Sequence, residues 1–229
     1  MSSLATCPIR YKALILDCDG VLVDSEPLHW QSWREVFLRH GVALSDDYMM
    51  RFVGMSSPQT MAALVELEHA FENLDPEELI RQKRELFWEY VDDRLEEIPG
   101  VSGFLNAMAR RVPLAMATGG PRATYHRVLR RMKWTDLFQV TVGADDIVNS
   151  KPHPEIYALT LERLGLPASA CLAFEDSAPG LEAARAAGLD VVGIASTYPP
   201  EYLAGRGACA IMRDFTDEDA LCAALGDRH

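Results

Sequence analysis

Short apolar runs alternate with longer stretches of helical spacing along most of the chain. The first run, Ala13–Leu16, is bounded by polar residues and glycine, which predicts a buried strand. Further runs are at 114–117, 139–142, 171–174, 191–194 and 210–212, and predicted helices at 101–111, 122–132, 154–164 and 181–187 lie between most of the runs. This alternation predicts an α/β fold with a mostly parallel sheet and helices on both faces.

Residues from Pro27 to about Asp93 have a different pattern, with helical spacing and no strand-like run. Ser25 precedes the first predicted helix as its N-cap, and Gly41 ends that helix. Ser57 and Asp75, each followed by proline, open two more helices. The sequence therefore predicts a core of residues 1–25 and 94–229, with a helical domain of residues 26–93 inserted just after the first strand.

Composition narrows the range of partners. The chain has 229 residues, 48% of them apolar, which is enough for a full core and too many for disorder. The formal charge of −12 and a pI near 4.9 argue against nucleic acid and against an anionic membrane. An anionic substrate would also be repelled at long range. A phosphate site in this chain therefore needs positive charge close by.

Cysteine usage and hydropathy point to a compartment. The five cysteines are odd in number, scattered and without CxxC spacing, which favours free thiols in a reducing cytosol. The first twelve residues have no apolar core of signal-peptide length, and nowhere do 18 apolar residues run together. We expect a soluble, cytoplasmic protein.

The string Asp17-Cys18-Asp19-Gly20 directly follows the first predicted strand. Ligands bind at the carboxyl ends of strands in open α/β sheets, and two aspartates there can divide the work of nucleophile and proton donor. The spacing does not fit a calcium loop, in which glycine stands at the sixth position. The string alone leaves catalysis and an ordinary solvated turn about equally open.

Three more polar groups follow later predicted strands or precede a predicted helix. Hydroxyl and backbone N–H groups suit phosphate oxygens, an ammonium suits an anion, and carboxylates suit Mg²⁺. Each group has an ordinary explanation in isolation, as a helix cap or a solvated charge. Their occurrence together, in this order, favours a site. The groups are Thr118-Gly119-Gly120-Pro121-Arg122, Lys151-Pro152 and Glu175-Asp176-Ser177.

On these motifs the chain resembles the haloacid dehalogenase superfamily of phosphatases and phosphomutases, over residues 13 to about 212. The inserted helices resemble the small cap domain of the branch that contains β-phosphoglucomutase and sugar-phosphate phosphatases. The resemblance implies a Rossmann-like core under that cap. It also implies a Mg²⁺-dependent phosphatase that acts on a small phosphorylated metabolite such as a sugar phosphate. A monomer is expected, because the cap has to open and close.

The resemblance also implies residue roles. Asp17 would be the nucleophile, and Asp19 would protonate the leaving oxygen and then deprotonate water. Mg²⁺ would be held by the Asp17 carboxylate, the Asp19 backbone carbonyl and Asp176, with Glu175 in an auxiliary role. The groups expected to hold the phosphoryl oxygens or to touch the rest of the substrate are Thr118, Lys151, Gly119, Gly120, Arg122, His29, Ser57 and Lys83.

Two other functions stay open. A mutase needs a cap arginine to clamp a second phosphate, and the position where β-phosphoglucomutase carries it corresponds to Ser57 here. A catalytically idle binding module would have lost Asp17 or Asp176, and both are present. Lys83 faces either the substrate or solvent. His29 either couples cap closure to Asp19 or packs on Trp33, and Arg122 either contacts the substrate or is an exposed first-turn arginine.

Overall fold

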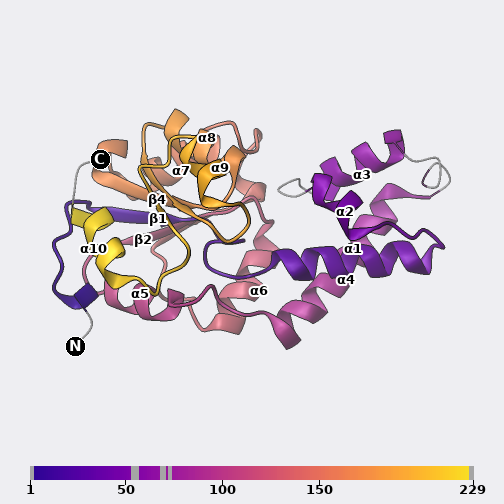
Figure 1. The fold of residues 1–229 in the computed structure, drawn as a ribbon, viewed down its shortest axis with the longest axis horizontal. Coiled ribbons are helices and arrows are strands. Elements are labelled where there is room, and N and C mark those ends of the chain that lie inside the picture. Colours follow the sequence, from indigo (N-terminus) through magenta and orange to yellow (C-terminus); the bar gives the residue numbers. More distant parts are fainter. Residues whose placement is uncertain (1–2, 53–56, 68–70, 72–73, 227–229) are drawn as a thin grey trace. The chain divides into compact units, whose positions relative to one another are not determined.

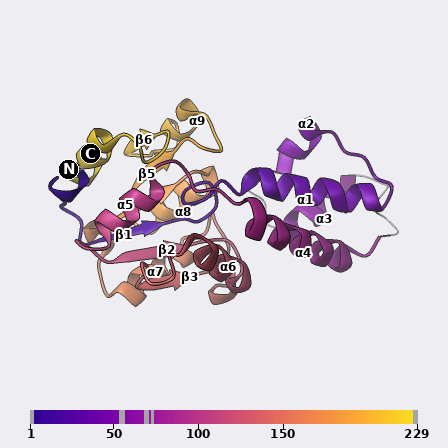
Figure 2. The ribbon, with the colours of Figure 1, turned by 90° about the horizontal axis from the view of Figure 1, so that it is seen from below.

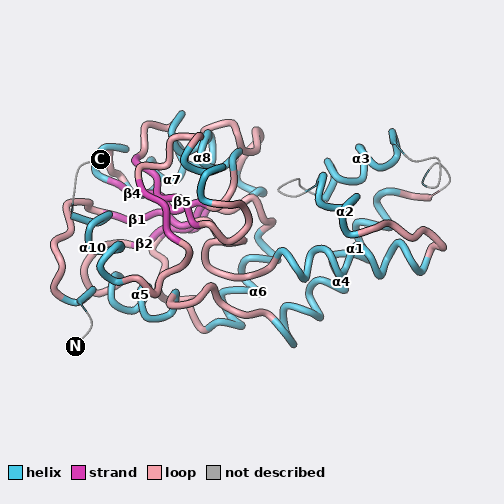
Figure 3. The backbone as a smooth tube through the Cα atoms, in the orientation of Figure 1, coloured by secondary structure: helices cyan, strands magenta, loops and turns pink. Residues whose placement is uncertain are grey.

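The structure is a computed structural model that describes residues 3–52, 57–67, 71 and 74–226. It divides into two compact units, one formed by Met1–Asp24 with Glu96–His229 and the other by Ser25–Leu95. Every strand of the described residues belongs to the first unit, and the second is helical (Figure 3). The role of the helical unit as a cap stays a prediction.

The first unit is built on a six-stranded sheet in the order β3-β2-β1-β4-β5-β6, with every neighbouring pair parallel (Figure 2). This confirms the predicted α/β fold with a parallel sheet. All predicted strand bounds agree with the structure to within one residue. The strands are β1 (Ala13–Leu16), β2 (Leu114–Ala117), β3 (Val140–Val142), β4 (Cys171–Glu175), β5 (Asp190–Ile194) and β6 (Ala210–Met212).

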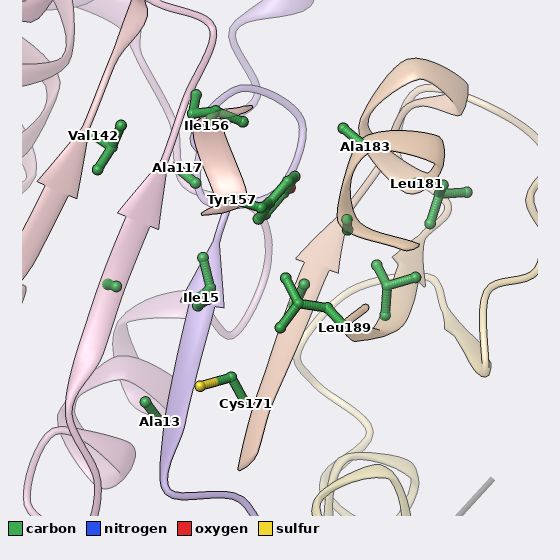
Figure 4. Packing of buried hydrophobic residues seen from close by; sticks show 14 of the residues in the cluster. Ala13, Ile15, Ala117, Val142, Ile156, Tyr157, Cys171, Leu181, Ala183 and Leu189 are labelled. Carbon is green, nitrogen blue, oxygen red and sulfur yellow. The ribbon is translucent and has the colours of Figure 1, made fainter. Parts of the chain in front are cut away.

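Successive side chains of each strand point to opposite faces of the sheet, so alternate residues belong to two separate layers of the core. Ile15, Ala117 and their neighbours pack under α7 and α8 in one cluster, with Tyr157 at its centre (Figure 4). The opposite face carries Phe174, whose ring lies 5.5 Å from that of Phe104 on α5. Figure 1 accordingly shows helices on both sides of the strands.

The helices of the first unit agree with the predicted ones but differ at their ends. The helix predicted at 154–164 begins one residue later in the structure. The helix predicted at 181–187 begins three residues earlier, where Ser177 caps it by accepting from Gly180 N at 3.1 Å. The sequence did not predict the short helices α9 and α10. The set is α5 (Val101–Met108), α6 (Arg122–Met132), α7 (Glu155–Leu164), α8 (Ala178–Ala186), α9 (Pro200–Ala204) and α10 (Glu218–Gly226).

The helical unit contains α1 (Glu26–Arg39), α2 (Asp46–Met49), α3 (Ser57–Leu67) and α4 (Pro76–Arg94). Asp75 caps α4 as expected, accepting from Glu77 N at 3.0 Å. Ser25 holds the N-cap position of α1 but its side chain makes no capping hydrogen bond. Aromatic rings join α1 to α4, because His29 stacks on Phe87 with ring centroids 3.9 Å apart. Phe37 on α1 lies 5.1 Å from Trp33 of the same helix and 5.0 Å from Phe71, between α3 and α4.

Two expectations from composition can be compared with the structure. All five cysteines are free thiols. Among the described residues, the helices are too short or too polar to cross a membrane.

Candidate active site

The carboxyl ends of β1 and β4 meet at the middle of the sheet. The chain leaves β1 toward β2 and β3 and later returns to the other side of β1 with β4, which makes this the point where strand order reverses. Asp17 follows β1 directly, and its backbone N–H donates to Phe174 O at 3.1 Å. Glu175 ends β4 and Asp176 follows it. The sheet therefore brings three carboxylates to the place where open α/β sheets bind ligands.

The loop after Asp17 turns tightly at Gly20, whose φ of +70° is in the left-handed region. Its N–H donates to Val23 O at 2.9 Å. A Cβ at this position would lie 2.1 Å from Asp176 Oδ2, so the Asp176 side chain approaches the Gly20 backbone directly. Glycine is therefore required here by both the turn and the contact. Cys18 is buried in the same loop, as expected of a small apolar residue, and burial raises the pKa of its thiol.

Thr118 follows β2 and places a hydroxyl beside this loop. Its backbone N–H donates to Val142 O on β3 at 3.0 Å, and its Oγ1 accepts from Gly120 N at 3.0 Å. A Cβ on Gly120 would lie 3.3 Å from Thr118 Oγ1 and 3.9 Å from Asp19 Oδ2. The Thr118 hydroxyl and the Asp19 carboxylate thus border the same glycine. Around Gly119 the space that a Cβ would occupy is open.

Lys151 reaches this group with its ammonium, which has three oxygen neighbours among the described residues. Nζ lies 2.5 Å from Glu175 Oε1, 3.1 Å from Asp17 Oδ2 and 3.2 Å from Ala117 O. Burial lowers the pKa of Lys151, but the Asp17 and Glu175 carboxylates more than offset this, so the pKa lies above its ordinary value. The lysine is therefore a fixed positive charge next to Asp17.

Glu175 is fully buried, and both its oxygens are occupied. Oε1 accepts from Lys151 and, at 2.6 Å, from the hydroxyl of Tyr157. Oε2 accepts from the backbone and side chain of Ser177, at 3.4 and 3.2 Å, and from Asp176 N at 3.2 Å. With this set of donors, Glu175 orients the lysine and has little capacity left to bind a cation.

Asp17 and Asp176 have the features of a cation site. Asp17 Oδ1 is buried and has no hydrogen-bond partner among the described residues. One ligand oxygen from each of Asp17, Glu175 and Asp176 lies within 4.8 Å of the others. Oxygen ligands suit Mg²⁺. With Lys151 this buried group has two net negative charges when all its members are ionised. A divalent cation fits both the orphaned oxygen and the excess charge.

The protonation of Asp17 depends on its surroundings. Burial raises the pKa of Asp17 to about 7, with smaller upward contributions from Glu175 and Asp19, while the ammonium of Lys151 opposes the rise. A bound cation would favour the ionised carboxylate in the same way as the lysine does. The site therefore requires positive charge to keep Asp17 ionised near neutral pH.

Arg122 begins α6 next to the Thr118 turn, but its guanidinium forms an ion pair with Asp146 at 2.8 Å. Its backbone N–H donates to Asp145. Asp146 also binds Arg163 at 2.9 Å. Arg122 is thus an exposed first-turn arginine with a carboxylate partner, and a contact between its side chain and substrate stays a prediction.

His29 and Lys83 lie together inside the helical unit. Lys83 Nζ is 2.5 Å from His29 Nδ1, and the His29 ring stacks on Phe87 with centroids 3.9 Å apart. Lys83 is only 4% exposed, which rules out the solvated helix face. Packing of the His29 ring on Trp33 is one of the two alternatives for this residue, and the ring contact that the structure shows is with Phe87. Ser57 is half-buried at the start of α3, and its neighbours 53–56 lie outside the described residues.

Tyr157 and Thr197 belong to the site and were missed by the sequence analysis. Tyr157 donates to Glu175 from α7, and Thr197 Oγ1 donates to Asp176 Oδ2. A signal for each was present. A buried tyrosine needs a partner for its hydroxyl. Thr197 is three residues past the end of β5, in a loop at the edge of the sheet where Asp17 and Thr118 directly follow β1 and β2.

Gly180 on α8 is expected to be essential for the position of Glu175. A Cβ on Gly180 would lie 2.0 Å from Glu175 Cδ, whereas a Cβ on Gly103 of α5 would meet nothing within 4 Å. We expect Gly180→Ala to lower the free energy of unfolding by about 1–3 kcal/mol. The control Gly103→Ala should raise it by roughly 0.5–1 kcal/mol. Thermal melts of the two variants provide the comparison, and equal Tm values would contradict the proposed contact.

Comparison with known proteins agrees with this geometry. Residues 11–188 match the family model described as haloacid dehalogenase-like hydrolase. The chain belongs to this family. The resemblance inferred from the motifs is thereby confirmed, as is the assignment of the protein as an enzyme of this hydrolase type.

Individual relatives align over most of their length. Fructose-1-phosphate phosphatase YqaB of Escherichia coli is 35% identical over 185 residues, 81% of this chain and 97% of that one. Phosphorylated carbohydrates phosphatase of Thermotoga maritima is 34% identical over 208 residues, 88% and 94% of the two chains. The crystal structure of CbbY from Rhodobacter sphaeroides in complex with phosphate has a TM-score of 0.81 at 25% identity, covering 90% and 96%.

Proposed function

We propose that this haloacid dehalogenase-like hydrolase is a Mg²⁺-dependent phosphatase that hydrolyses a small phosphorylated metabolite, with a sugar phosphate as the expected class. The observation that carries the proposal is the pairing of Asp17 with a fixed lysine on one side and an orphaned buried oxygen on the other. The names of two relatives, a fructose-1-phosphate phosphatase and a phosphorylated carbohydrates phosphatase, support the substrate class.

Asp17 is the proposed nucleophile. One of its carboxylate oxygens forms a bond to phosphorus while the ester P–O bond breaks, and Asp19 gives its proton to the leaving oxygen. In the second step Asp19 takes a proton from water, which attacks phosphorus and releases inorganic phosphate and the Asp17 carboxylate. Asp19 thus acts first as general acid and then as general base. Its place beside Gly120 and the Thr118 hydroxyl suits this role.

Charge stabilisation has to provide most of the acceleration. Hydrolysis of a phosphate monoester can require an acceleration of order 10²¹, about 28 kcal/mol, whereas a general acid provides about 10²–10⁴. Lys151 and Thr118, with the turn at Gly119 and Gly120, would hold the phosphoryl oxygens. Asp17, Asp176 and the Asp19 carbonyl would hold Mg²⁺, which would neutralise charge on the transferring group. Glu175 would hold Lys151.

The helical unit is the proposed source of contacts to the rest of the substrate. His29, Lys83 and Ser57 are its candidate residues, and the part-buried His29–Lys83 pair gives this unit a positive or hydrogen-bonding group beside the ring of Phe87. Arg122 remains a further candidate through its exposed guanidinium. We propose that the enzyme works as a monomer in the cytoplasm.

Phosphate release from a panel of phosphomonoesters tests the proposal. The panel should contain hexose 1-phosphates, hexose 6-phosphates, pentose phosphates and non-sugar phosphates, each with Mg²⁺ and with EDTA. Asp17→Asn serves as the blank. We expect release that needs Mg²⁺ and favours a few sugar phosphates. If no member releases phosphate, the phosphatase assignment fails. Interconversion of a hexose 1-phosphate in the presence of its bisphosphate would then identify a mutase, and binding without either reaction an idle module.

A further inference from the structure

The segment after β5 contacts the site on two sides. Ser196 Oγ donates to Gly20 O at 2.5 Å, and Thr197 Oγ1 donates to Asp176 Oδ2. A Cβ on Gly20 would lie 2.1 Å from Asp176 Oδ2 and 2.9 Å from Thr197 Oγ1. The Thr197 hydroxyl, the Asp176 carboxylate and the Gly20 backbone therefore converge on one point. None of the motifs that carry the family resemblance includes these two hydroxyls.

The hydroxyl of Thr197 has one proton to give, and an ionised carboxylate can only accept. Donation to Oδ2 stabilises the charged form of Asp176 and restricts rotation of its carboxylate. Threonine suits this role because its branched Cβ leaves few χ1 rotamers. Asp176 is 5% exposed, so water has little access to replace the hydroxyl. The carboxylate is thus held in one orientation before any cation arrives.

We propose that Thr197 is a positioning residue that fixes the Asp176 carboxylate and thereby sets both the affinity of the site for Mg²⁺ and its preference for Mg²⁺ over Ca²⁺. This inference rests on the proposed magnesium site. Hydrogen-bond partners of metal ligands typically contribute 10–100-fold to metal affinity. Ser196 donates to the carbonyl oxygen of Gly20, the residue after Asp19, and so holds the neighbouring backbone.

The preference follows from the different demands of the two cations. Mg²⁺ requires near-ideal octahedral geometry at about 2.0–2.1 Å, whereas Ca²⁺ accepts six to eight oxygens at variable angles and about 2.3–2.6 Å. If the carboxylate becomes free to rotate, the site loses more affinity for Mg²⁺ than for Ca²⁺. Removing the Thr197 hydroxyl should therefore weaken the binding of Mg²⁺ more than the binding of Ca²⁺. A residue that only supported the local fold would not change this ratio.

The test is titration of the metal-free full chain with Mg²⁺ alone and with Ca²⁺ alone, in which binding is measured by the rise in Tm. Thr197→Val keeps the side-chain volume and removes the hydroxyl. We expect this variant to bind Mg²⁺ about 10–100-fold more weakly, with a smaller loss of affinity for Ca²⁺. Thr197→Ser restores the hydroxyl and should lose much less than about 10-fold of the Mg²⁺ affinity. Thr197→Ala gives the same comparison if the valine variant does not fold.

The outcomes separate this inference from the proposed function. A Thr197→Val variant that keeps the original Mg²⁺ affinity and Mg²⁺/Ca²⁺ ratio would overturn the positioning role while the magnesium site stands. An equal loss for both cations would also overturn it. Asp176→Asn is the control for the site itself and should lose the Mg²⁺-induced rise in Tm. If Mg²⁺ has no effect on the original chain in either Tm or phosphate release, the proposed magnesium site is overturned.

Discussion

Asp17→Asn is expected to abolish phosphate release and at the same time to make the metal-free protein more stable. Loss of the nucleophile should reduce turnover by at least about 10⁴-fold, because no other described carboxylate has the same lysine contact and open oxygen. The gain in stability has a separate cause. Asp17 is a charge buried for function, and asparagine has nearly the same shape without the charge.

The sign of the stability change follows from the pKa of Asp17. An aspartate in the unfolded chain has a pKa of about 3.9, whereas burial raises the pKa of Asp17 in the folded, metal-free protein to about 7. Between these values the folded state binds more protons than the unfolded state, so stability falls as pH rises. Above pH 7 the full cost is present, on the order of 4 kcal/mol. The asparagine of the variant does not titrate and avoids this cost.

Thermal melts from pH 5 to pH 8 in EDTA would measure the effect. We expect the Tm of Asp17→Asn to exceed that of the original chain by several degrees at pH 8, since about 1 kcal/mol shifts the Tm of a chain of this size by roughly 2–4 °C. The difference should shrink toward pH 5. Addition of Mg²⁺ should stabilise the original chain more than the variant. A variant that retains substantial activity would remove Asp17 as the nucleophile, and a lower Tm at pH 8 would contradict the cost of its burial.

The strand ends explain why so much of the site could be predicted from the sequence. Buried strands of a parallel sheet are short apolar runs, so their ends are visible in the pattern to within one residue. Because all the strands are parallel, their carboxyl ends share one edge. Asp17, Thr118 and Asp176 could therefore be placed together without knowledge of any contact. The residue that directly follows β5 is Ala195, so the same rule does not reach Thr197, three residues past the strand end.

Other features depended on packing that no local pattern reveals. Lys83 is on a charged helix, and only the approach of α1, with His29 54 positions earlier, buries it. Glu175 could be assigned to the metal or to an auxiliary role, and the choice came from the donors that Tyr157 and Ser177 bring to its two oxygens. The short helix α10 has little amphipathic pattern, and its neighbour is the distant residues Ser3–Ala5, where Ser3 N donates to Glu218 at 2.6 Å.

Lys151→Met is expected to lose both activity and stability, in contrast to Asp17→Asn. The ammonium of Lys151 lies 3.1 Å from Asp17 Oδ2 and 2.5 Å from Glu175 Oε1, and so provides the positive charge beside both carboxylates. Its removal leaves these carboxylates buried without a countercharge. Breaking a buried ion pair in this way costs about 3–5 kcal/mol, which corresponds to a fall in Tm of about 10 °C for a chain of this size. Turnover should fall by at least about 10³-fold, because a fixed charge on the transferring phosphoryl group is lost.

A double variant separates the two losses. Glu175→Gln in the Lys151→Met background removes one negative charge along with the positive one. The amide oxygen of glutamine can accept from Ser177, and its NH2 group can donate to the Tyr157 hydroxyl, which also serves as an acceptor. We expect the double variant to recover much of the lost Tm but none of the turnover, because charge balance alone determines the first and the ammonium itself the second. Thermal melts in EDTA and phosphate release with Mg²⁺ would be measured on both variants. If the double variant were no more stable than Lys151→Met, the lysine would stabilise the fold by its packing rather than by its charge. Full activity in either variant would mean that the phosphoryl group is held elsewhere.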